Sequence, residues 1–209
     1  MANTNVARGF IPYAYVSGAP YNGSANIYYK AAGYGTALYV GDPVVTHSAS
    51  NDANGVPAVQ IAVSNTVPGM VGVVVGISDG GPLAATPVTV TRDLPIYSPA
   101  STAQYLLVAD DPNLLFMIQD DASSQATAPN LWPGLNAHFV SGTGSTVTGY
   151  SGYQLLASSV ATTGTLDLKI IRGLNQADNV ISSVANTNMN AKWLVRVNRH
   201  EYVNQTAGL

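Results

Sequence analysis

Short apolar and β-branched segments recur along almost the whole chain, and in several of them apolar and polar residues alternate. Segments 88–91, 166–171 and 193–197 show this most clearly, with valine, leucine, isoleucine or tryptophan at every second position. Successive side chains of a β-strand point to opposite faces, so a period of two places these residues on one buried face. Strands are therefore expected at residues 37–40, 43–46, 59–63, 71–77, 88–91, 105–108, 114–118, 153–156, 166–171 and 193–197.

Turn-forming sequences separate these segments, and helical periodicity is almost absent. Gly, Pro, Asp and Asn cluster at residues 41–43, 54–55, 79–82, 110–113 and 132–134. A short helix is expected only at residues 179–185, and the uncharged stretches 141–152 and 157–165 are expected to be long hairpin ends. The pattern predicts an all-β fold, either an antiparallel β-sandwich or a jelly-roll or barrel-like arrangement.

The first thirty residues differ from the rest of the chain. Glycines and prolines punctuate a dense set of aromatic residues there. Frequent turn residues disfavour long regular structure, whereas so many aromatics need a surface on which to be buried. We therefore expect residues 1–30 to be an irregular N-terminal arm lying on its own domain or on a neighbour. Residues 31–209 would form a single β-rich domain, in which residues 193–209 are the C-terminal strand and tail.

Charged residues are unusually rare. They make up 9% of the chain, with one glutamate and three lysines, whereas a typical soluble domain is about a quarter charged. A surface with so little charge repulsion suits a protein that is covered by partners and self-associates in a closed oligomer. The chain contains no cysteine, which removes disulfides, thiolate catalysis and zinc–cysteine sites. The first eight residues are polar and do not resemble a secretory signal.

The few charges are unevenly distributed. Residues 1–168 carry three basic and nine acidic side chains, and residues 169–209 carry five basic and two acidic ones. A nucleic-acid binder usually has a denser basic patch interleaved with aromatics, so no nucleic-acid partner is expected. Complementary charge at a subunit contact, or a solvated strand face, explains the basic tail better. The longest apolar run, residues 69–77, is about half the length needed to cross a bilayer, and no membrane association is expected.

Side chains that could support catalysis are scattered. His47, His138 and His200 are far apart in sequence, and Gly149-Tyr150-Ser151-Gly152 is followed by Tyr153 where a nucleophile elbow needs glycine. We therefore predict no catalytic, cofactor-binding or metal-binding residues and no enzymatic activity.

Two aspartate pairs, Asp110-Asp111 and Asp120-Asp121, form the one acidic cluster. They could bind Ca²⁺ or supply a glycosidase pair, but the intervening strand separates them by roughly 20 Å. The simpler interpretation is that Asp110 and Asp111 belong to a turn that caps itself and that Asp120 and Asp121 solvate the other end of the strand. Calcium binding stays open.

Six segments of the chain are distinctive: GDPV (41–44), GVVVG (72–76), YLLVADDP (105–112), FMIQDD (116–121), GLNA (134–137) and AKWLVRVNRHEYVNQTAGL (191–209). They resemble structural proteins of tailed bacteriophages, in particular the small β-rich cement, or decoration, proteins of phage heads. The C-terminal segment is the most specific. The resemblance implies a non-enzymatic virion protein, made in the host cytoplasm and bound to the outer capsid surface. There it would reinforce contacts between major capsid protein subunits.

Interfaces favour tyrosine, tryptophan and arginine over lysine and glutamate, as this chain does. A homo-oligomer is expected, with a trimer favoured and a dimer left open. Residues beyond Val197 are expected to anchor the chain to a neighbour and to be dispensable for folding. The alternative is a carbohydrate- or receptor-binding β-sandwich of a head fibre or tail tip. The predicted interface residues are Phe10, Tyr13, Tyr15, Tyr21, Trp193, Arg196, Arg199 and Tyr202.

Overall fold

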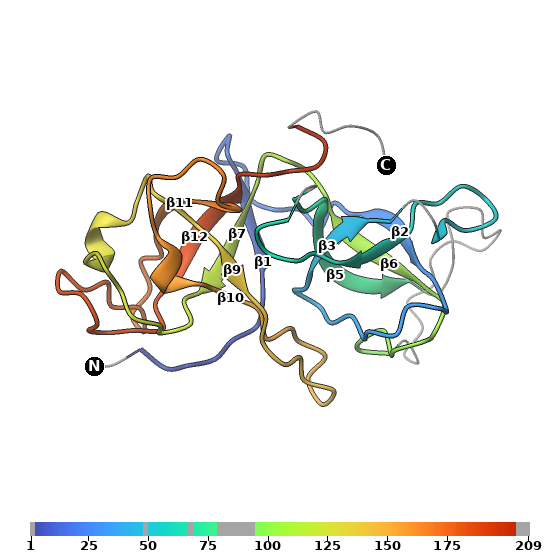
Figure 1. Ribbon diagram of the computed structural model, residues 1–209, viewed down its shortest axis with the longest axis horizontal. Helices are drawn as coiled ribbons and strands as arrows, with labels where there is room; N and C mark the ends of the chain where they lie inside the picture. Colours follow the sequence, from blue (N-terminus) through green and yellow to red (C-terminus); the bar gives the residue numbers. More distant parts are fainter. Residues whose placement is uncertain (1–2, 48–49, 67–68, 79–94, 204–209) are drawn as a thin grey trace.

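The computed structural model describes residues 3–47, 50–66, 69–78 and 95–203, and this part of the chain is almost entirely β-structure. Two five-stranded antiparallel sheets occupy the two halves of the molecule (Figure 1). The predicted all-β antiparallel sandwich is confirmed. Sheet I has the strand order β1 (Ile11–Tyr15), β7 (Leu114–Gln119), β12 (Lys192–Val197), β11 (Leu168–Gly173) and β8 (Asn136–Ala137).

Sheet II curves almost into a barrel. Its order is β2 (Asn26–Lys30), β6 (Gln104–Ala109), β5 (Gly72–Ser78), β3 (Pro43–Thr46) and β4 (Val59–Ile61). The two edge strands approach each other through a parallel bridge between Tyr29 and Ala58, and the Tyr29 N–H donates to the Pro57 carbonyl at 3.0 Å. The edges of this sheet are thereby partly protected from pairing with other chains.

A two-stranded ribbon, β9 (Phe139–Val140) and β10 (Gln154–Leu155), completes the strands, with 3₁₀ turns at Pro129–Leu131 and Ala157–Ser159. The ribbon makes residues 141–152 a hairpin loop, as predicted, and this loop projects from the middle of the molecule (Figure 1). Residues 157–165 instead connect β10 to β11, two strands that do not pair with each other.

The larger of the two main cores joins the sheets. The inward residues of β7 and β12 alternate as expected, with Phe116, Trp193 and Val195 almost inaccessible. Val45 and Val73 of sheet II belong to the same core, so the sheets pack against each other. The second core lies within the curve of sheet II and contains Tyr28, Leu38, Val44, Val59, Val71, Val74, Ile77, Leu106 and Val108.

Three further expectations about local structure are wrong. Residues 11–15 and 26–30, expected to be part of an irregular arm, are strands β1 and β2 and pair with β7 and β6. Tyr28 is buried and Tyr15 is half-buried against the cores, so these two side chains are covered within the same chain, whereas Tyr13 is exposed. Residues 179–185 form bends and turns rather than a helix, and residues 37–40 form isolated bridges rather than a strand. The strand predicted at 88–91 lies outside the described residues.

Candidate functional site

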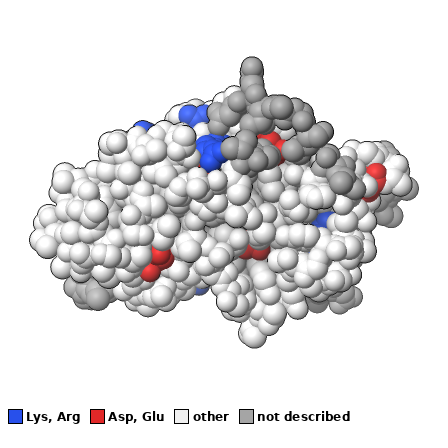
Figure 2. All heavy atoms as spheres, viewed as in Figure 1, with Lys and Arg blue, Asp and Glu red and all other residues white. Residues whose placement is uncertain are grey.

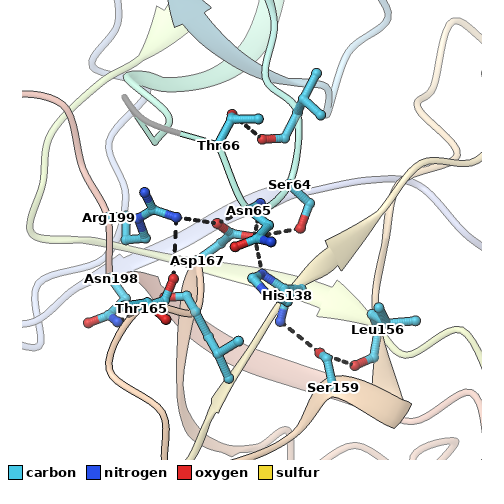
Figure 3. A network of polar contacts seen from close by, with 12 residues as sticks. Ser64, Asn65, Thr66, His138, Leu156, Ser159, Thr165, Asp167, Asn198 and Arg199 are labelled. Carbon is cyan, nitrogen blue, oxygen red and sulfur yellow. Dashed lines mark hydrogen bonds and ion pairs between the residues drawn. The ribbon is translucent and has the colours of Figure 1, made fainter.

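A polar cluster links the two sheets around the carboxylate of Asp167 (Figure 3). Asp167 directly precedes β11, and His138 lies between β8 and β9. Ser64 and Asn65 follow β4 of sheet II, and Arg199 follows β12. We call this set the Asp167 junction. It brings a serine, a histidine and an arginine to one aspartate, so its geometry decides what it can do.

Neighbouring donors surround the buried carboxylate of Asp167. The Ser64 hydroxyl and the His138 Nδ1–H each donate to Oδ2 at 2.6 Å, and the Asn65 backbone N–H donates to both oxygens at 3.2 Å. The Arg199 guanidinium lies 3.8 Å from Oδ1. Because a carboxylate only accepts hydrogen bonds, His138 carries its hydrogen on Nδ1 in this pair. These contacts compensate the cost of burying the charge.

The same geometry does not form a nucleophilic triad. A nucleophilic serine must be hydrogen-bonded to the histidine that removes its proton, whereas Ser64 is bonded to the aspartate. The Asp167 junction is therefore a structural clamp between the sheets. No local sequence pattern predicts this contact, because Ser64 and Asp167 are 103 residues apart.

The Asp120–Asp121 pair organises backbone inside the protein. The Asp120 carboxylate is fully buried and accepts the backbone N–H groups of Asn190 at 2.8 Å and Ala191 at 2.9 Å. The Asp121 carboxylate accepts the backbone N–H groups of Ser123 and Ala157. Burial raises the pKa of Asp120, and the hydrogen bonds it accepts oppose that rise.

The Asp110–Asp111 pair lies at the opposite end of β7. Asp110 accepts hydrogen bonds from the Tyr28 hydroxyl at 2.7 Å and the Asn26 amide at 2.9 Å, and Asp111 caps the turn by accepting from the Asn113 N–H at 2.7 Å. The two aspartate pairs thus do not converge on one site. Nowhere in the described ranges do three His, Asp or Glu side chains gather as a possible metal site.

Two of the predicted interface residues lie in the protein's own core. Phe10 makes edge-to-face contacts with Phe116 and Phe139, with ring centroids 6.0 and 5.9 Å apart, and Trp193 packs on Trp132 at 4.8 Å. Phe10 and Trp193 have at most 1% of their surface exposed. They stabilise the fold and present no surface to a partner, so their assignment to the interface is wrong.

The other aromatic residues of the predicted interface are partly or largely exposed. Tyr15 and Tyr21 are half-buried against the main core, whereas Tyr13 and Tyr202 are 43% and 55% exposed. The Tyr202 hydroxyl lies 2.5 Å from that of Tyr28. Tyr13 and Tyr202 therefore remain available to a partner.

The two predicted interface arginines are held by neighbouring groups. Arg196 donates to the Pro112 carbonyl at 3.0 Å and to the Asn113 side chain at 3.1 Å, and Arg199 contacts Asp167 and the Thr165 carbonyl. Their side chains are thus partly committed within the chain rather than free to act as anchors.

Residues 198–201 are integrated into the fold, contrary to the expectation that the chain beyond Val197 is dispensable for folding. The Met70 N–H donates to the Arg199 carbonyl and the Glu201 N–H donates to the Met70 carbonyl, both at 3.1 Å. The Glu201 carboxylate accepts from the backbone and hydroxyl of Thr46. The intervening His200 is buried. This segment crosses from sheet I to sheet II and cannot be a dispensable tail.

An apolar patch sits on the projecting hairpin loop. Val147, at 84% exposed, is the most exposed large apolar residue described, and Tyr150 and Ile96 are 41% and 50% exposed. The loop holds its own shape, because the Ser145 N–H donates to the Tyr150 carbonyl and the Gly149 N–H donates to the Ser145 carbonyl. A Cβ on Gly149 would lie 2.3 Å from the Ile96 carbonyl oxygen, so the loop packs directly on residue 96. We call Ile96, Val147 and Tyr150 the loop patch.

Comparison with protein families, with curated proteins and with solved structures found no match in any of the three. No helix in the described part of the chain has the length and apolar character needed to span a bilayer.

Proposed function

We propose that the protein is a cement, or decoration, protein of a tailed-phage virion. It would bind the outer capsid surface and reinforce contacts between major capsid protein subunits. The proposal rests on the sequence resemblance and on the nature of the exposed surface. Its activity would be the burial of surface between subunits, which requires no catalytic group.

The observation that carries the proposal is the nearly uncharged surface. Figure 2 shows one face of the molecule on which acidic and basic side chains are sparse and scattered. Large apolar side chains are exposed as well, among them Val63, Leu131, Val147 and Val184. A freely diffusing monomer usually exposes more charge, and exposed apolar residues of this kind gain free energy when a partner covers them.

The loop patch is the best candidate for a capsid contact. It projects from the body, carries no charged residue between positions 141 and 152, and is preordered by its own hydrogen bonds. Preordering lowers the entropy lost on binding. Apolar and tyrosine side chains at the tip of a rigid loop suit insertion between subunits of a lattice.

The test uses purified heads of the phage that encodes the chain, stripped of this protein. The intact protein should saturate the heads in a cosedimentation assay, and Val147→Asp should weaken binding at least tenfold, because it would bury a charge in the contact. Val184→Asp, at a 60% exposed site elsewhere, is the matched control and should bind normally. Absence of binding by the intact protein would refute the proposed function, whereas normal binding by Val147→Asp would refute only the loop contact.

A further inference from the structure

A pocket on the outer side of sheet I collects basic and amide side chains from three adjacent strands. Asn136, Lys169 and Arg196 are direct cross-strand neighbours on β8, β11 and β12, so their side chains lie in one row on one face. They line a cavity of about 380 Å³ together with Asn198 and His200. Its volume lies near the lower end of the roughly 300–1,000 Å³ range of small-molecule sites.

The two cations in the pocket have only neutral partners. Lys169 Nζ donates to the Gly134 carbonyl at 2.6 Å, and Arg196 donates to the Pro112 carbonyl and the Asn113 side chain. No described residue that lines the pocket is acidic. By contrast, Lys192 of the same sheet forms an ion pair with Asp178 at 2.6 Å. Two adjacent half-buried cations without a carboxylate favour an anionic ligand.

Two buried polar atoms on residues that line the pocket have no hydrogen-bond partner among the described residues. One is Asn136 Oδ1, on a side chain whose amide nitrogen donates to the Thr163 carbonyl at 2.9 Å. The other is Nε2 of His200. These residues are 6% and 2% exposed, and buried polar groups of this kind are normally paired. The unpaired Asn136 oxygen therefore indicates that a ligand supplies a donor.

His200, which lines the pocket, has a neutral imidazole ring. Burial lowers the pKa of His200, although the carboxylate and backbone of Asp110 and the carboxylate of Glu201 offset part of this effect. The neutral ring accepts the Tyr202 N–H at Nδ1, at 3.2 Å, so its own hydrogen is on Nε2. The pocket thus combines donors on Lys169 and Arg196 with an acceptor on Asn136.

We propose that this pocket binds an anionic sugar. Its carboxylate or phosphate would be held by Lys169 and Arg196, and a neighbouring hydroxyl would donate to Asn136 Oδ1. A simple anion such as sulfate satisfies the cations but offers no donor to Asn136, and a neutral sugar offers hydroxyls but no charge. The proposed sugar site is a further function beside the proposed capsid role. It does not depend on that role, because sugar binding is measured on the isolated chain.

The test titrates the full chain with glucuronate, glucose 6-phosphate, glucose and sulfate, and follows binding by calorimetry and by the amide NMR signals of residues 136, 169 and 196. At least one anionic sugar should bind, and glucose and sulfate should each bind at least tenfold more weakly than it does. The two anionic sugars distinguish a carboxylate site from a phosphate site.

Variants assign the binding to the pocket. Lys169→Gln should weaken binding of the anionic sugar about tenfold, since it removes a charge-assisted hydrogen bond. Arg172→Gln is the matched control, because Arg172 lies exposed on the same strand outside the pocket, and it should bind normally. If thermal melting shows that Lys169→Gln is unfolded, Arg196→Gln replaces it with the same expectation.

Three results would overturn the proposal. The first is no saturable binding of either anionic sugar up to about 10 mM, the range of the weakest specific sites. The second is sulfate or glucose binding as tightly as the anionic sugars. The third is an equal effect of Lys169→Gln and Arg172→Gln, which would indicate general charge attraction rather than a site.

Discussion

The indole N–H of Trp193 donates to the carboxylate of Asp120 at 3.2 Å, and both side chains are completely buried. Trp193 lies on β12 and Asp120 directly follows β7, the strand that pairs with it. The same carboxylate accepts the backbone N–H groups of Asn190 and Ala191, which lead into β12. A single buried aspartate thus fixes the start of the central strand of sheet I.

Replacing Trp193 should therefore act through both packing and this hydrogen bond. Trp193→Ala leaves a cavity beside Trp132 and should lower the free energy of unfolding by about 3–5 kcal/mol. Trp193→Phe keeps most of the apolar contact but removes one donor from Asp120, and should cost about 1–3 kcal/mol. Urea denaturation of the two variants measures both values. Equal stability of the two variants would contradict the packing contribution, and a Trp193→Phe variant as stable as the wild type would contradict the contribution of the hydrogen bond.

Asp42 should make the stability depend on pH. Burial raises its pKa to about 6, although hydrogen bonds from Ser151 and the Tyr39 N–H oppose the rise. Between the unfolded value, 3.8, and about 6 the folded state binds more protons than the unfolded state. This contribution to stability is therefore fully present below pH 4 and is lost as the pH rises to 6.

Asp42→Asn removes that titration and isolates its effect. The stability of the wild type relative to Asp42→Asn should fall by up to about 3 kcal/mol between pH 4 and pH 7. Urea denaturation of both proteins at several pH values gives the difference directly. A difference that stays constant with pH would contradict the assignment to Asp42.

Truncation after Val197 should destabilise the protein. It removes the Met70 backbone pairing with residues 199 and 201, the buried His200 and the Glu201 contacts with Thr46. Loss of several buried hydrogen bonds should cost at least about 3 kcal/mol. Glu201→Gln keeps the segment but weakens only the Thr46 contact, and should fall between the wild type and the truncated chain. A truncated chain as stable as the wild type would show that this segment does not hold the sheets together.

The strands of the centre and the C-terminus could be predicted, because they are short runs of apolar and β-branched residues bounded by turn-forming sequences. Residues 43–46 were predicted with the observed bounds, and β7 and β12 to within one residue. Strands β1 and β2 were not predicted, because each has only five residues and the frequent glycines and prolines around them indicate irregular structure. Their partners, β7 and β6, are far along the chain, and no local pattern indicates such pairing.

The candidate sites could not be predicted for the same reason. The Asp167 junction and the Asn136–Lys169–Arg196 row depend on which strands become neighbours, which a single sequence does not reveal. From the sequence, Lys169 was placed only in a basic tail and Arg196 was predicted to be an interface residue. Composition suggested aromatic residues as interface residues, but it could not separate Phe10 and Trp193, which fill the core, from Tyr13 and Tyr202, which reach the surface.

Self-association is expected of a surface with so little charge and so many exposed apolar residues. The purified protein should sediment as a closed oligomer, with a trimer expected, at micromolar concentration. Sedimentation equilibrium at low and high salt measures this. Because apolar contacts dominate, the association should persist at high salt. A monomer under both conditions would contradict the prediction.

The central claim, a structural role on the capsid surface, is tested most directly by counting the protein in purified particles. Quantitative mass spectrometry of the phage that encodes it gives its copy number relative to the major capsid protein. The proposed role predicts a copy number comparable to that of the major capsid protein, in a simple ratio set by the lattice. Absence from the particle, or only a few copies as expected for a tail-tip or fibre component, would contradict it.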